Sequence, residues 1–83
     1  MIAMTGKNGK SVRLSADFHL DTEKEFYTVY SGGTTFEFPD FRPAAHVYKT
    51  LSKYIEDEVD VTPMLRNLAR AARLLGYSVK EVA

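Results

Sequence analysis

The sequence predicts an α+β domain in which a four-stranded antiparallel meander is followed by two α-helices packed on one face of the sheet. Apolar residues alternate with polar ones up to about Pro39, and after it they recur at spacings of three and four. A chain of 83 residues is also the size of one small domain. We therefore expect a single domain over residues 1–83, with the sheet at about 1–38 and a helical hairpin at about 43–83.

The first half of the chain predicts strands joined by tight turns. Val12, Leu14 and Phe18 alternate with polar residues, as in a strand with one buried face. Asn8-Gly9 is a strong hairpin signal because both residues tolerate positive φ. Two further turns are expected at residues 21–24 and 31–33. The expected strands lie near residues 1–5, 10–20, 25–31 and 34–38.

The second half predicts two helices. Pro43 suits a first helical turn, and a stripe with helical spacing follows it, made of Ala44, Val47, Tyr48, Leu51, Tyr54 and Ile55. Thr62 is expected to cap a second helix in which Pro63 is the first residue, and Gly76 to end it in the left-handed conformation. The second helix should span about residues 63–75.

The composition of the chain restricts the partners and the cellular compartment that we expect. Eleven basic and eleven acidic residues give no net charge, so the chain as a whole has no electrostatic attraction to nucleic acid or anionic membranes. There is no cysteine, which favours a reducing compartment, and we expect a cytoplasmic protein. No apolar run approaches the length of a membrane span.

No pattern indicates catalysis, a metal or a nucleotide. Residues 6–11 end in Gly-Lys-Ser, as a phosphate-binding loop does, but Met4 replaces the first glycine and a strand should follow. Asp17, His19 and Asp21 alternate along one strand, too far apart to close around one zinc ion. We expect no catalytic residues, no metal and no cofactor, and a protein that is not an enzyme.

The third expected strand carries large side chains on both faces, at Phe26, Tyr27, Val29 and Tyr30. Two short helices cover only one face of a sheet, so the other face should contact a partner protein or a second copy. The alternative is an ordinary, partly solvent-exposed surface, on which tyrosine is common.

Charges cluster locally. An acidic run is formed by Glu56, Asp57, Glu58 and Asp60, and one face of the second helix carries Arg66, Arg70 and Arg73, opposite a stripe of Leu65, Leu68, Ala72 and Leu75. The arginines have three possible roles: to bind phosphates, to pair with the acidic run, or to face solvent. The acidic run is a second candidate protein-interaction surface, because it resembles a phosphate backbone in charge.

The end of the chain resembles a helix-turn-helix of the Fis type, in which an arginine- and alanine-rich helix ends in Leu-Leu-Gly before a recognition helix. The matching residues are Ala71, Ala72, Leu74, Leu75, Gly76, Ser78, Val79 and Val82. The resemblance implies DNA binding, although only five residues follow Ser78, fewer than a recognition helix needs.

These observations favour a non-enzymatic protein-interaction module. By size and class alone, it is similar to small inhibitors and adaptors of phages and mobile elements, such as anti-CRISPR proteins. The alternative is a small DNA-binding regulator that uses Arg66, Arg70, Arg73 and Lys80.

Overall fold

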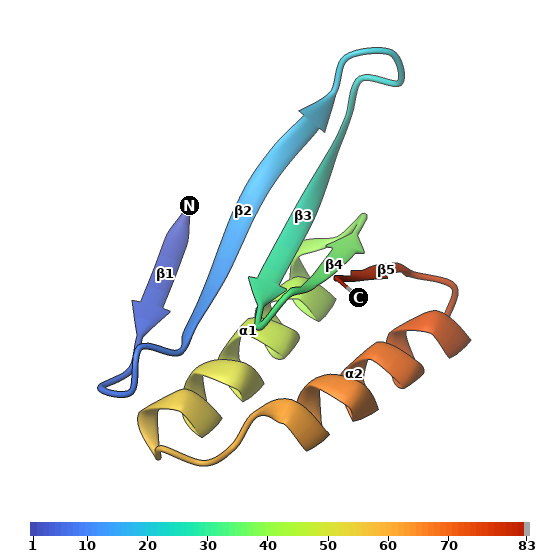
Figure 1. The fold of residues 1–83 in the computed structure, drawn as a ribbon. Coiled ribbons are helices and arrows are strands. Elements are labelled where there is room, and N and C mark those ends of the chain that lie inside the picture. The colour runs from blue at the N-terminus through green and yellow to red at the C-terminus, as the bar shows by residue number, and fades with distance from the viewer. Residues whose placement is uncertain (83) are drawn as a thin grey trace.

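The computed structural model describes residues 1–82 and shows an α+β fold with a five-stranded antiparallel sheet and two helices (Figure 1). The elements follow in the order β1 (Ile2–Thr5), β2 (Ser11–His19), β3 (Lys24–Ser31), β4 (Thr34–Phe38), α1 (Phe41–Glu56), α2 (Thr62–Leu74) and β5 (Ser78–Glu81).

The fifth strand corrects the expected count of four. The strand order is β1-β2-β3-β4-β5 and every neighbouring pair is antiparallel, so both helices lie between β4 and β5 in the chain. In β5, Val79 lies opposite Phe36 and Glu81 opposite Thr34. The residues that resemble the start of a recognition helix therefore form an edge strand.

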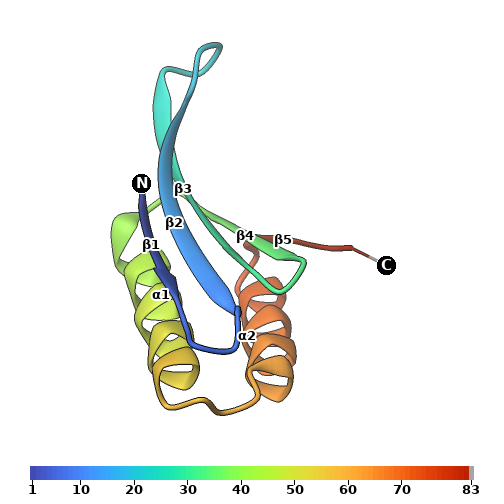
Figure 2. The same cartoon turned by 60° about the vertical axis from the view of Figure 1, so that its left-hand side comes forward.

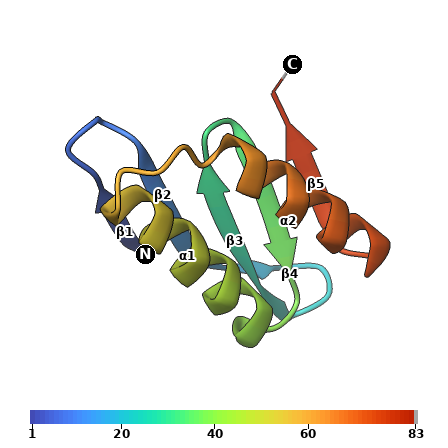
Figure 3. The same ribbon diagram turned by 90° about the horizontal axis from the view of Figure 1, so that it is seen from below.

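Both helices cover the same face of the sheet, as expected, and no element of residues 1–82 covers the other face, which we call the bare face (Figure 2). Viewed from below, α1 crosses β2 and β3, while α2 lies beside β4 and β5 (Figure 3). The core fills the space between the two layers. Its largest fully buried side chains are Phe36, Phe38, Leu51 and Ile55.

The β1–β2 turn forms where expected but with different geometry. The Gly6 N–H donates to the Lys10 carbonyl at 2.8 Å, and the Gly9 N–H donates to the Gly6 carbonyl at 3.1 Å. Gly9 has a φ of 80°, whereas Asn8 does not have positive φ. The turn thus has one left-handed residue, as in a three-residue hairpin loop, and not the two expected for a two-residue Asn-Gly turn.

The helix ends confirm one expected cap and correct another. Gly76 has a φ of 88°, and the Tyr77 N–H donates to the Ala72 carbonyl at 2.9 Å, which confirms the left-handed stop. Thr62, however, is the first residue of α2 and makes no side-chain cap. Asp60 supplies the acceptor instead, because its Oδ1 accepts a hydrogen bond from the Thr62 N–H at 3.0 Å.

Candidate interaction surfaces

The β2–β3 hairpin projects beyond the rest of the sheet. β1 pairs with β2 only as far as Leu14, and β4 pairs with β3 only as far as Tyr27. Residues 16–26 therefore form a two-stranded extension with no further strand on either side, which we call the arm (Figure 1). Two strands alone are marginally stable in water, so the arm depends on the sheet at its base.

Large apolar side chains of the arm are exposed to solvent. Phe18 continues the inward-facing row of β2 past the end of the helical layer and is 52% exposed. Leu20, where the arm turns, is 87% exposed. At the base, the Phe41 ring meets the Tyr27 ring edge-on with centroids 5.6 Å apart, and Phe41 is itself exposed. Apolar surface thus extends from α1 toward the arm tip.

The arm is acidic. Its ionisable side chains are those of Asp17, His19, Asp21, Glu23, Lys24 and Glu25, which give a net charge of −3 with histidine neutral. At its base the Tyr27 hydroxyl donates to Glu25 Oε2 at 3.2 Å. Burial raises the pKa of Tyr27, and the Glu25 carboxylate adds to this effect.

The bare sheet face carries only part of the predicted aromatic surface. Val29 is fully buried and Tyr27 packs against the core, so neither is available to a partner on that face. Phe26 and Tyr30 do lie on the bare face, but each is partly covered. The His19 ring stacks on Phe26 at 4.1 Å, and the Arg13 guanidinium lies 4.7 Å from the centroid of the Tyr30 ring.

The arginines of α2 line a hollow between this helix and β5. The hollow holds about 460 Å³, and its lining includes Arg66, Arg70, Arg73 and Leu74. Glu81, also in the lining, pairs with Arg73 at 3.2 Å. Within residues 1–82, Arg66 and Arg70 make no ion pair.

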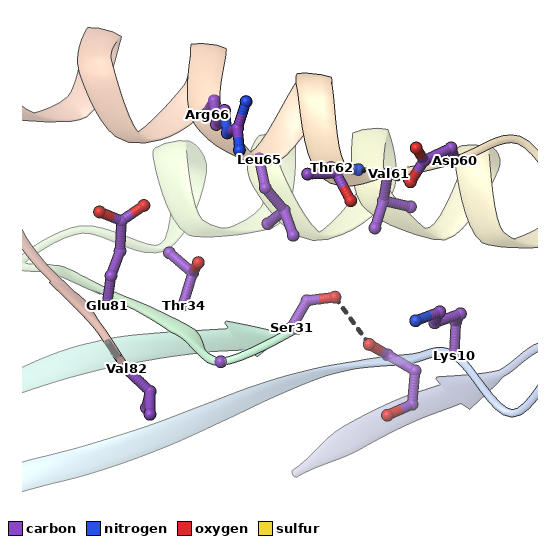
Figure 4. Close-up of a pocket in the computed structure, with 13 residues that line it drawn as sticks. Lys10, Ser31, Thr34, Asp60, Val61, Thr62, Leu65, Arg66, Glu81 and Val82 are labelled. Atoms are coloured by element: carbon purple, nitrogen blue, oxygen red, sulfur yellow. Dashed lines mark hydrogen bonds between the residues drawn. The ribbon is translucent and has the colours of Figure 1, made fainter.

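A second hollow of about 610 Å³ continues toward the first turn of α2, and Arg66 and Glu81 belong to both linings. Figure 4 shows Lys10 on the sheet side and Asp60 at the start of α2. We call the two hollows together the basic groove, because its four cations outnumber the carboxylates of Asp60 and Glu81.

The apolar stripe predicted for α2 is only partly buried. Leu65 and Ala72 are in the core and Leu68 is half-buried against it, but Leu75 is 75% exposed. Leu74, which is not part of the predicted stripe, is 82% exposed. Ala69 takes the buried position instead. The helix ends at Leu74, so Leu75 lies beyond the part of the stripe that the sheet covers.

Within residues 1–82, no residue of the acidic run forms an ion pair with the arginine face, although Asp60 is close enough to Arg66 to feel its charge. All four of its residues, Glu56, Asp57, Glu58 and Asp60, are exposed around the end of α1. Asp57 pairs with Lys53 at 3.7 Å. Hydrogen bonds from Thr62 lower the pKa of the Asp60 carboxyl, and the nearby charges of Lys10 and Arg66 act in the same direction.

The residues of the DNA-binding alternative do not form one surface. Arg73 faces Glu81 on β5, whereas Lys80 is the neighbouring residue of that strand and lies on its opposite face. In the described part of the chain, no recognition helix follows Gly76. Three arginines of α2 remain as the candidate phosphate-binding set.

Residues 6–11 form a hairpin turn leading into β2, not a loop leading into a helix. Across residues 1–82 there is no group of three His, Cys, Asp or Glu residues placed to hold a metal ion. Neither described helix has the length and apolarity that a membrane span requires.

Comparisons of the chain with protein-family models, with curated proteins and with solved structures gave no match. The arm, the bare sheet face and the basic groove are therefore the features of the molecule that bear on its function.

Proposed function

We propose that this protein is a non-enzymatic protein-interaction module, of the inhibitor or adaptor kind, that binds its partner through the arm. The observation that carries the proposal is the exposure of Phe18 and Leu20 on a hairpin that extends beyond the helical layer. Exposed apolar groups that are close together on a small domain usually mark an interaction surface.

The form of the arm supports this proposal. A projecting hairpin presents side chains from both of its faces, so a partner can enclose Phe18 on one side and Phe26 on the other. Burying one large apolar side chain contributes about 1.5–3 kcal/mol before the costs of association. Two or three such groups therefore supply the core of a small interface.

A second candidate function is phosphate-backbone binding by α2. The observation that favours it is that Thr62–Leu74 contains three arginines and no acidic residue. Against it, Arg73 is already paired with Glu81, and the chain has no net charge. We therefore rank this function below protein binding.

The test places a photo-crosslinking phenylalanine analogue at position 18 and, in a control protein, at Val59. Val59 is a matched control because it is 50% exposed but lies in the α1–α2 connection, far from the arm in sequence. We expect protein adducts in cells from position 18 and few from position 59. Equal yields from both positions, or none from position 18, would contradict the proposal.

A further inference from the structure

The arm and the basic groove are complementary in charge. The arm has a net charge of −3, whereas α2 carries three arginines and no acidic residue. Arg66 and Arg70 have no ion-pair partner within residues 1–82, so their charges are available to a ligand. Opposite charges on two surfaces speed their encounter and disfavour partners of the wrong sign.

The two surfaces also match in their apolar groups. Leu20 is the most exposed large apolar side chain of the arm, and carboxylates follow it at Asp21 and Glu23. The groove offers Leu74, which is highly exposed, beside the arginines. The groove is therefore suited to a peptide segment in which one apolar side chain is flanked by carboxylates.

No residue of the arm belongs to the lining of the molecule's own basic groove. The arm projects past the helical layer (Figures 1 and 2), and a separate hollow lies between it and residues 75–78, which follow α2. Two complementary surfaces of one chain that do not meet within it can meet between two copies.

We propose that the tip of the arm, residues 20–25, docks in the basic groove of a second copy of this chain. The arm of the second copy docks in the groove of the first in the same way. This inference rests on the proposed function, because it names the partner of the arm. A two-fold axis makes both contacts at once and closes the assembly as a dimer, whereas a one-way contact would continue into a filament.

Charge reversal tests the contact directly. In the arm variant, Asp21→Lys and Glu23→Lys place positive charge opposite the arginines. In the helix variant, Arg66→Glu and Arg70→Glu place negative charge opposite the acidic arm. Each variant alone should be monomeric because both contacts of its dimer become repulsive.

Mixing the two variants should restore a dimer. In the mixed pair, the lysines of one arm meet the glutamates of the other copy's groove, and the unchanged arm meets the unchanged arginines. Sedimentation equilibrium at about 0.05 M salt, where screening is weak, measures the mass against the 9.4 kDa chain. We expect dimers for wild type and for the mixture.

A control variant with Lys7→Glu and Lys49→Glu has the same change of net charge as the helix variant, at exposed positions outside the arm and groove. It should dimerise like wild type, and circular dichroism should show an intact fold in all variants.

Three results would overturn the proposal. They are a monomeric wild type at about 0.5 mM, a dimer that survives either reversal, and two monomeric variants that fail to pair when mixed. A monomeric wild type together with adducts from position 18 to a different protein would overturn only this inference, and the proposed function would stand.

Discussion

Glu58 and Gly76 occupy the same position, the first left-handed residue after a helix, at the ends of α1 and α2. Their φ values are 58° and 88°. At both ends the next residue donates back into the last turn: Val59 to the Tyr54 carbonyl and Tyr77 to the Ala72 carbonyl, each at 2.9 Å. Glycine adopts this conformation freely, whereas a residue with a Cβ atom does so at a cost.

Replacing Glu58 with glycine should therefore stabilise the protein by about 1 kcal/mol. Glu56→Gly is the matched control, since it removes the same charge from the last residue of α1 and should destabilise the protein by about 0.5–1 kcal/mol. Urea unfolding followed by circular dichroism measures both. Equal effects of the two substitutions would show that charge, and not the backbone conformation, decides the result.

Gly6 is expected to resist substitution for a different reason. Its φ is not positive, so backbone entropy alone would make alanine slightly stabilising. A Cβ atom at Gly6 would, however, lie 2.6 Å from Cγ2 of Ile55, a fully buried core residue. Overpacking of this kind costs about 1–3 kcal/mol, which should outweigh the entropic gain from alanine.

Gly6→Ala should accordingly lower the free energy of unfolding and the midpoint of thermal unfolding. Gly9→Asn in the same turn is the comparison, because a Cβ atom there meets nothing within 4 Å and asparagine tolerates positive φ. Gly9→Asn should lower the free energy of unfolding by less than Gly6→Ala does. A Gly6→Ala protein as stable as wild type would show that α1 shifts easily against the β1–β2 turn.

Asp60 should make stability depend on pH in the acid range. Its folded pKa is lower than its ordinary value of 3.8 because it accepts hydrogen bonds from Thr62. A group with a lowered folded pKa contributes stability above its unfolded pKa, and this contribution disappears as the pH falls through the folded pKa.

We therefore expect the stability difference between wild type and Asp60→Asn to shrink as the pH falls from about 6 to about 2.5. Denaturant midpoints measured across this range test the expectation. A difference that stays constant with pH would mean that the charge of Asp60 does not act on folding.

The sequence contained enough information for β1 to β4 and both helices. The helices and β2 have clear apolar periods, and the other three strands are bounded by Asn8-Gly9 and by the turns expected at residues 21–24 and 31–33. It did not reveal β5. Val79 is the one inward-facing apolar residue in that strand, and the pairing with β4 joins segments about 40 residues apart in the chain. Ser78–Glu81 follows an alanine-rich helix and a glycine, so local resemblance favoured a helix.

The shape and exposure of the candidate surfaces were predicted less well than the fold. The expectation of only two short helices correctly indicated that they cover one sheet face, but the sequence did not indicate which side of β3 each aromatic residue occupies. The arm was not foreseen, because its projection depends on where β1 and β4 end relative to β2 and β3. Leu20 and Phe18 continue the same alternation as buried Leu14, and only this unequal strand length separates them from the core.

Duplex DNA should bind only weakly to this protein. If α2 bound it, each arginine that neutralises a phosphate would release a counterion, and removing one arginine would reduce the log–log salt slope by about one. Arg73 is held by Glu81, and Lys80 lies on the other face of β5, so few cations act together. We expect no binding tighter than about 10 μM at about 0.15 M salt. Fluorescence anisotropy with a labelled duplex measures this. Micromolar binding that weakens in an Arg70→Ala protein of unchanged fold would instead make the basic groove a phosphate-binding surface, and the regulator would become the leading function.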